Sequence, residues 1–158
     1  MEDKRITKTK RALKSALLEL LTTQAFDVIS ITELCKIANV SRITFYTHYK
    51  DKFALLDDIF NDMLIIGKEG YHRRQEENNP ENNLTQGYLN VLDSILSLYY
   101  ERYDFFQHVV PETNPYLAFR FYRILLDTVE SHTDKLKASY SLKYSARQIA
   151  GFICFGMF

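Results

Sequence analysis

Apolar residues recur at helical spacing along most of the chain. From Ile6 to Leu21 they form one stripe of a helix with 3.6 residues per turn, and the opposite face carries Lys and Arg. The same period continues over residues 84–103, 116–136 and 144–158. No segment alternates with a period of two for long, so strands are not supported. The pattern predicts an all-α fold.

The strongest local signals predict two short helices joined by a tight turn. Ser30 and Glu33, three residues apart, form a capping box that starts a helix over residues 31–38. Ser41 is a good N-cap for a second helix over residues 42–48. Only two residues separate the first helix from the second cap, so the pair is predicted to form a helix-turn-helix.

A long third helix and a linker are predicted next. Asp51 can cap the helix, whose broad apolar face continues to about Gly67 or Gly70. The polar run Glu76–Asn83, EENNPENN, predicts a linker, and a second break is expected after residue 110. We therefore expect an N-terminal helix-turn-helix DNA-binding domain in residues 1–50. A C-terminal helical regulatory and dimerisation domain is expected in residues 51–158.

The charge distribution agrees with this division. The chain has 158 residues and no formal net charge. Residues 1–52 hold ten Lys and Arg against six Asp and Glu, whereas residues 53–158 hold ten against fourteen. A basic front part suits binding to nucleic acid, although differences of a few charges are common.

The remaining composition narrows the class of protein. Cys35 and Cys154 lie far apart in apolar segments, which predicts two buried thiols rather than a disulfide or a metal site. The charged N-terminus has no apolar signal core, and no run approaches the roughly 20 apolar residues of a membrane span. We expect a cytoplasmic protein with no membrane partner.

The second short helix has the residue types of a DNA-reading helix. With Phe45 and Tyr49 taken as the inward pair, helical geometry places Ile43 and Thr47 on the opposite face and Thr44 and Tyr46 at its flanks. Arg can donate to guanine, Thr can bond a base or a phosphate, and apolar side chains can contact the thymine methyl group. The predicted base-reading residues are Arg42, Ile43, Thr44 and Thr47, together with Thr32 of the first helix.

A second set of residues is predicted to bind DNA phosphates. Its members lie at helix termini, where free amide groups and the helix dipole attract anions. They are Ser30, Tyr46, His48, Lys50 and Lys52. Alone, the two lysines would be an ordinary solvated pair, and Tyr46 or His48 could simply cover the surface. Their placement after two capped helices favours the phosphate interpretation.

The motif resembles that of the TetR family of transcriptional regulators. The resemblance covers roughly residues 8–60 and rests on SITELCKIANVS and ITFYTHYKDKFALL. Asn39 stands where the family usually has Gly, and Asn tolerates the left-handed backbone that a turn needs. The resemblance implies that the base-reading and phosphate positions other than Lys50 contact DNA. It also implies a divergent helical body that binds a small ligand and dimerises.

The C-terminal part fits the body of that family only in outline. Aromatic residues gather around the predicted break, and they line a ligand pocket or fill the core of a helical bundle. The pocket candidates are Tyr99, Tyr103, Phe106, Phe119 and Tyr122. The histidines of this part are scattered, so no metal site is predicted. No cofactor motif or catalytic grouping was found, which argues against an enzyme.

The last helical run is the predicted seam of a dimer. It ends inside GFICFGMF without a C-cap signal, so we expect the natural polypeptide to continue or the tail to pack on a partner. In the family the last two helices form a four-helix bundle across a twofold axis, and only the first of them is present here. The seam candidates are Ile149, Phe152, Ile153, Phe155 and Gly156.

Together these features predict a sequence-specific transcriptional regulator. We expect a ligand-responsive repressor that binds double-stranded DNA as a homodimer on a pseudo-palindromic operator. A small-molecule effector or a partner protein would tilt the helix beginning at Asp51 and change the spacing of the two reading heads. The alternative is an interaction module that activates transcription when a partner protein binds its body.

Overall fold

The computed structural model describes residues 4–137, 141 and 143–155, and these residues form only helices and connecting segments. The prediction of an all-α fold, with a helix-turn-helix head and a helical bundle, is confirmed. The elements are α1 (Lys4–Leu21), the 3-10 helix η1 (Phe26–Val28), α2 (Ile31–Ala38), α3 (Arg42–His48), α4 (Lys52–Asn78), α5 (Leu84–Glu101), α6 (Tyr103–Phe106), α7 (Pro115–Lys137) and α8 (Ala146–Phe155).

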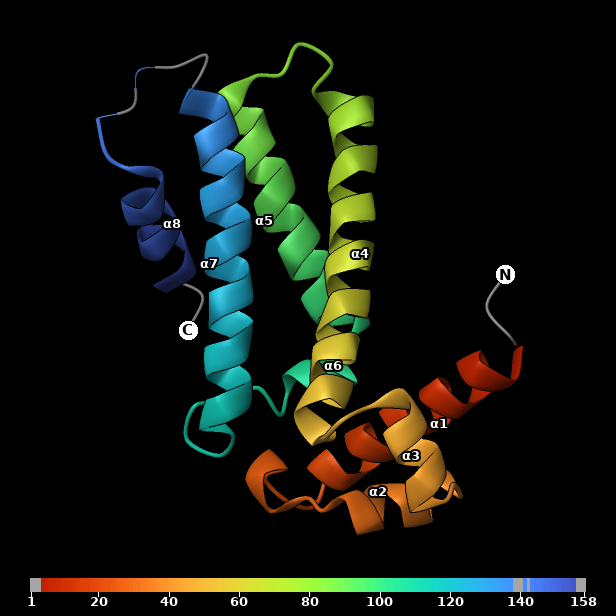
Figure 1. Ribbon diagram of the computed structural model, residues 1–158. Coiled ribbons are helices and arrows are strands. Elements are labelled where there is room, and N and C mark those ends of the chain that lie inside the picture. Colours follow the sequence, from red (N-terminus) through yellow and green to blue (C-terminus); the bar gives the residue numbers. More distant parts are fainter. Residues whose placement is uncertain (1–3, 138–140, 142, 156–158) are drawn as a thin grey trace.

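The helices form a head and a body (Figure 1). Helices α1, α2 and α3 gather at one end of the molecule and make up the head. Helices α4, α5 and α7 stand side by side as the columns of the body, and α8 lies along the outer side of α7. The short α6 lies where the body meets the head.

Helix α4 is longer than the sequence suggested. It continues through Gly67 and Gly70 to Asn78, so the prediction that it ends near these glycines was wrong. Gly70 is buried, and a Cβ there would lie 3.9 Å from the Ser94 hydroxyl of α5 and 3.2 Å from the Arg74 guanidinium. The Ser94 distance is an ordinary van der Waals contact and the Arg74 atom is the end of a flexible side chain, so a Cβ could be accommodated here. The packing of α4 along α5 offsets the low helix propensity of glycine.

The linker is correspondingly shorter than predicted, because α4 takes up its first residues. It comprises residues 79–83 and is organised by Asn79, which is 4% exposed. The Asn79 amide nitrogen donates to the carbonyl of Asn83, and its amide oxygen accepts from the Asn83 backbone N–H at 2.6 Å. Asn83 in turn caps α5 by accepting from the backbone N–H of Gln86.

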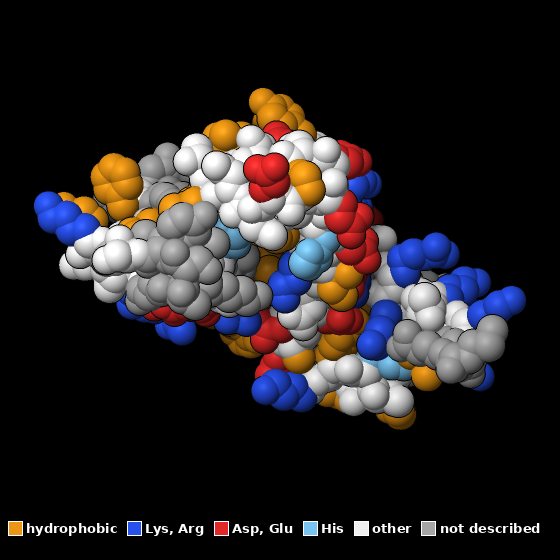
Figure 2. Space-filling view, turned by 90° about the horizontal axis from the view of Figure 1, so that it is seen from above, with side chains coloured by type: hydrophobic (Ala, Val, Ile, Leu, Met, Phe, Trp, Pro, Cys, Tyr) orange, Lys and Arg blue, Asp and Glu red, His pale blue; other side chains and the backbone are white. Residues whose placement is uncertain are grey.

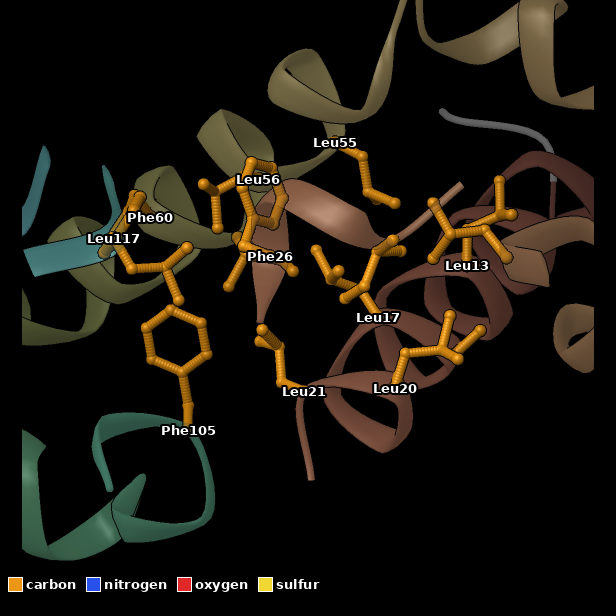
Figure 3. Packing of buried hydrophobic residues seen from close by; sticks show 14 of the residues in the cluster. Leu13, Leu17, Leu20, Leu21, Phe26, Leu55, Leu56, Phe60, Phe105 and Leu117 are labelled. Carbon is orange, nitrogen blue, oxygen red and sulfur yellow. The ribbon is translucent and has the colours of Figure 1, made fainter. Parts of the chain in front are cut away.

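Two apolar clusters hold the fold together. The first includes the inward faces of all three head helices and of α4, and it continues into α6 and the start of α7. Figure 3 shows Phe26 of η1 between α1 and α4, with Leu117 of α7 beside Phe60 and Phe105 beneath them. The second cluster joins α5, α7 and α8. The head and the lower body thus share one core.

Two smaller expectations concern the cysteines and membrane spans. Cys35 and Cys154 are both buried and free, as predicted. Burial raises the pKa of the Cys154 thiol to about 11, so it stays protonated near neutral pH. Among the described helices, none is both long enough and apolar enough to cross a membrane.

Candidate nucleic-acid interface

Helix α2 begins and ends at the signals that the sequence carries. The Ser30 hydroxyl accepts from the backbone N–H of Glu33, and the Glu33 carboxylate accepts from the backbone N–H of Ser30 at 2.9 Å. At the other end Asn39 has φ 53° and ψ 47°, the left-handed conformation expected there. The Val40 N–H then donates to the carbonyl of Cys35, which completes a Schellman-type stop.

Helix α3 follows directly and presents one face to solvent. The Ser41 hydroxyl accepts from the backbone N–H of Thr44 and starts the helix. Phe45 is fully buried and Tyr49 is 5% exposed, so these two anchor the inward face as predicted. On the opposite face Ile43 is 82% exposed. In this position the Ile43 side chain can contact a thymine methyl group.

Most of the predicted base-reading residues lie on the open side of the helix-turn-helix. Arg42, Thr47 and Thr32 are exposed, and Thr44 is half-buried. The Thr47 hydroxyl donates to the carbonyl of Ile43, and the Thr44 hydroxyl is 2.8 Å from that of Ser41. These two threonines can therefore offer methyl groups and oxygen lone pairs to a base without leaving their present rotamers.

The predicted phosphate residues divide into two groups. Tyr46 and Lys50 are exposed, and His48 is half-buried at the end of α3. Ser30 is exposed, but its hydroxyl donates to the Glu33 carboxylate at 2.6 Å. That bond, with the backbone bond from Ser30, holds the pKa of Glu33 below its ordinary value. A phosphate at Ser30 would have to share the hydroxyl with a carboxylate.

Lys52 has a role that the sequence analysis did not predict. Its ammonium group donates to three backbone carbonyls of the turn before α2, those of Phe26 at 2.9 Å, Asp27 at 2.7 Å and Ile29 at 2.8 Å. The same ammonium lies 5.0 Å from the centre of the Phe26 ring. Since an ammonium has three N–H donors, the observed bonds use all of them. Lys52 therefore fixes η1 to α4.

A carboxylate that the sequence analysis missed joins the reading helix to α1 and α4. Asp58 of α4 accepts from the Tyr49 hydroxyl at 2.6 Å and lies 3.2 Å from the Lys14 ammonium of α1. Burial raises the pKa of Asp58, but the Tyr49 hydrogen bond and the Lys14 charge outweigh this effect, so the pKa is lowered. Tyr49, the residue after α3, is thereby held at both its ring and its hydroxyl.

Helix α1 adds positive charge to the head. Lys4, Arg5, Lys8 and Arg11 are exposed along it. Figure 2 shows Lys and Arg side chains gathered at the end of the molecule over α1, whereas Asp and Glu lie nearer the middle. The uneven charge along the sequence thus becomes an uneven charge in space, which favours an approach of polyanions to the head.

The five aromatic residues predicted to line a ligand pocket do not form one site. Tyr99 packs against Tyr103 and Phe106, with ring centres 6.0 and 5.4 Å apart. Phe119 is 60% exposed, and Tyr122 packs against the second core cluster. A cavity of about 420 Å³ lies elsewhere, between residues 21–25 and 107–114, where the head meets the body.

The residues of the predicted dimer seam are only partly described. Phe152 of α8 is 86% exposed and Ile149 is half-buried. The side chains of Ile153 and Phe155 and the whole of Gly156 lie outside the described part of the chain. Within the described residues, no group of three or more His, Cys, Asp and Glu side chains could hold a metal ion.

Comparisons with known proteins show likenesses in sequence and in fold, while no family model matches the chain. An uncharacterized HTH-type transcriptional regulator of Bacillus subtilis (strain 168), YxbF, is 40% identical over 58 residues, which are 37% of this chain and 14% of that protein. The solved structure of the dihydroxyacetone kinase operon activator DhaS aligns with 92% of this chain and 80% of its own, at a TM-score of 0.54 and 23% identity. The chain thus has the fold of DhaS and, over part of its length, the sequence likeness of a helix-turn-helix regulator.

Proposed function

We propose that the protein is a sequence-specific DNA-binding transcriptional regulator. The exposed outer face of α3 carries this proposal, above all Ile43, which is 82% exposed beside the exposed Arg42 and Thr47. A helix with buried Phe45 and Tyr49 on one side and these residues on the other can enter a major groove without rearrangement. The likeness to an HTH-type regulator supports the same conclusion.

In this proposal one set of residues in the head contacts bases and another contacts phosphates. Arg42, Ile43, Thr44 and Thr47 contact base edges, with Thr32 beside them. Tyr46, His48 and Lys50 contact phosphates, and the basic face of α1 adds a longer-range attraction. The three bonds of Lys52 to backbone carbonyls give it a supporting role within the head.

We further propose that the protein works as a homodimer on a pseudo-palindromic operator. The exposed Phe152 of α8 supports a contact between copies of the chain. Two heads can bind together only if their spacing matches the groove repeat of roughly 34 to 36 Å. An effector that changes this spacing would change the affinity for the operator.

The homodimer is tested by the mass of the protein in solution. A mass twice that of the chain, measured by light scattering, would support the dimer, and a mass of one chain would exclude it.

The test of base reading uses duplexes selected from a random pool by the wild-type protein. Arg42→Ala should lose discrimination at one base position by about 1–3 kcal/mol, because a bidentate contact to guanine is removed. Arg73→Ala removes an exposed arginine from α4 within the body and serves as the matched control. Equal specificity of the two variants would remove Arg42 from the base-reading set.

The sign of regulation separates the two candidate functions. A repressor lowers transcription from a promoter that carries the selected site, whereas an activator raises it. One solved structure with a similar fold is named an operon activator, and the exposed Tyr100 and Phe119 of the body offer apolar surface to a partner. Transcription in vitro with purified polymerase would distinguish the two. Activation that requires an added protein would support the interaction module.

A further inference from the structure

We propose that Asn114 and Tyr116, at the start of α7, are positioning residues for DNA binding. They hold the turn η1 and so couple the body to the reading helices. The inference rests on the proposed function. It adds a second coupling between the body and the head, through the contacts of α7 with η1, which is separate from any tilt of α4. Figure 1 shows the lower end of α7 next to the segment that joins α1 and α2.

Asn114 makes a buried bond across the junction between head and body. Its side-chain oxygen accepts from the backbone N–H of Phe26 at 2.7 Å, although the two residues are 88 positions apart. Asn114 is 6% exposed, and its own backbone N–H donates to the carbonyl of Val110 at 2.8 Å. A buried N–H that loses its partner is costly, so η1 must follow any movement of Asn114.

Tyr116 adds an aromatic contact to the same turn. Its ring stacks on that of Phe26 with the centres 5.5 Å apart and the planes at 11°. It also makes an edge-to-face contact with the ring of Phe53 of α4, with the centres 5.0 Å apart and the planes at 71°. Phe26 is only 1% exposed, so its ring is enclosed by residues of α4 and α7. Packed rings of this kind transmit displacement because interiors have little free space.

The turn η1 leads directly into the helix-turn-helix. Lys52 binds the carbonyls of Phe26 and Ile29, and Ile29 is buried beside the first residue of the capping box, Ser30. A shift of η1 therefore moves the start of α2. An open surface pocket of about 420 Å³ lies beside these contacts, lined by residues 21–25 and 107–114. Asn114 lines this pocket and contacts η1 at the same time.

The test compares two variants at the junction with matched controls, using a duplex selected by the wild-type protein. Asn114→Ala removes the acceptor for the Phe26 N–H. Thr133→Val removes a buried hydroxyl that bonds Tyr88 within the body, and it controls for a general loss of stability. Tyr116→Leu removes the stacked ring, whereas Tyr116→Phe keeps it. The dissociation constant, its dependence on salt and the exchange of backbone amides are measured for each protein.

We expect Asn114→Ala and Tyr116→Leu to bind the duplex three- to tenfold more weakly with an unchanged salt slope. The phosphate contacts remain, but the head is held less well. Amides of residues 26–34 should exchange faster in both variants, and Thr133→Val and Tyr116→Phe should match the wild type. Since coupling is reciprocal, DNA should slow amide exchange at residues 116–118 of the wild type but not of Asn114→Ala.

The outcomes separate this inference from the proposed function. If the wild-type protein selects no duplex, the proposed function fails and the positioning role fails with it. If it binds a selected duplex and the junction variants bind equally well, only the inference is overturned. Should Asn114→Ala not fold, the Tyr116→Leu and Tyr116→Phe pair decides. A weakening accompanied by a lower salt slope would also overturn it, because lost phosphate contacts would then explain the effect.

Discussion

Two lysines at the end of the helix-turn-helix illustrate how neighbours of the same type differ in role. Lys50 is exposed, so its ammonium is open to a phosphate. Lys52 is half-buried and donates to three carbonyls of the turn around η1. The sequence shows two lysines close together after a reading helix. Only the folded chain shows that one of them faces the inside of the head.

This difference predicts that removing the Lys52 charge weakens the fold, whereas removing the Lys50 charge weakens DNA binding. Lys52→Met should lower the free energy of unfolding by about 1–3 kcal/mol, because it leaves carbonyls without a charged donor. Lys50→Met should change stability by less than about 0.5 kcal/mol. It should reduce the salt slope of DNA binding by about 0.9, the contribution of one phosphate. Urea unfolding and binding at several salt concentrations measure both effects. If Lys52→Met instead lowered the salt slope and left the free energy of unfolding unchanged, Lys52 would be a phosphate-binding residue.

At the scale of elements, the head is a set of short helices that cannot hold their positions alone. Helix α3 has seven residues and α2 has eight, which is too short for independent stability. Their caps fix where they start and stop, while α1 and α4 fix how they lie. Asp58 links these supports, because its carboxylate contacts Tyr49 after α3 and Lys14 of α1.

The lowered pKa of Asp58 predicts how this link responds to pH. A carboxyl group whose pKa is lower in the folded state stabilises the fold above its ordinary pKa of 3.8. That contribution is lost as the pH falls through the lower folded value. Asp58→Asn should therefore be less stable than the wild type at pH 7 by about 0.5–1.5 kcal/mol. The difference should shrink below pH 3.8, as followed by thermal unfolding across pH.

Asp62→Asn is the matched control for this prediction. Asp62 also bonds the Lys14 ammonium, at 2.5 Å, but its side chain is 55% exposed. Its replacement should cost less, since exposed ion pairs contribute little. Equal losses for the two variants, or a difference at Asp58 that persists at low pH, would contradict the role given to the Tyr49 contact.

At the scale of the whole molecule, the head and the lower body share one apolar core. If this core provides most of the free energy of unfolding, the two parts should unfold together. Phe105 of α6 is 1% exposed and lies against Phe60 of α4, with the ring centres 5.5 Å apart. Phe105→Ala should lower the free energy of unfolding by about 3–5 kcal/mol. We expect one transition in urea, seen equally by circular dichroism and by a fluorescent label on the head. Two separate transitions would show that the head is stable without the body.

The sequence predicted those features that depend on neighbouring residues. Caps, turns and the inward pair of α3 follow from local spacing, and the left-handed Asn39 followed from a residue type that tolerates this backbone. The bonds of Lys52 and Asn114 join residues 23 to 88 positions apart, so no local pattern reveals them. No local pattern revealed the course of α4 past Gly70 either, where the helix packs along α5. Distant partners, rather than helix propensity, account for what was missed.

Because α4 is one unbroken helix, a small tilt of its axis produces a large displacement of the head of the proposed regulator. With 27 residues it is about 40 Å long, at roughly 1.5 Å per residue. A rotation of about 5° around its distant end moves its head end by about 3.5 Å, close to the rise of one base pair, about 3.4 Å. A tilt of about 5° is thus enough to shift a reading helix by about one base step.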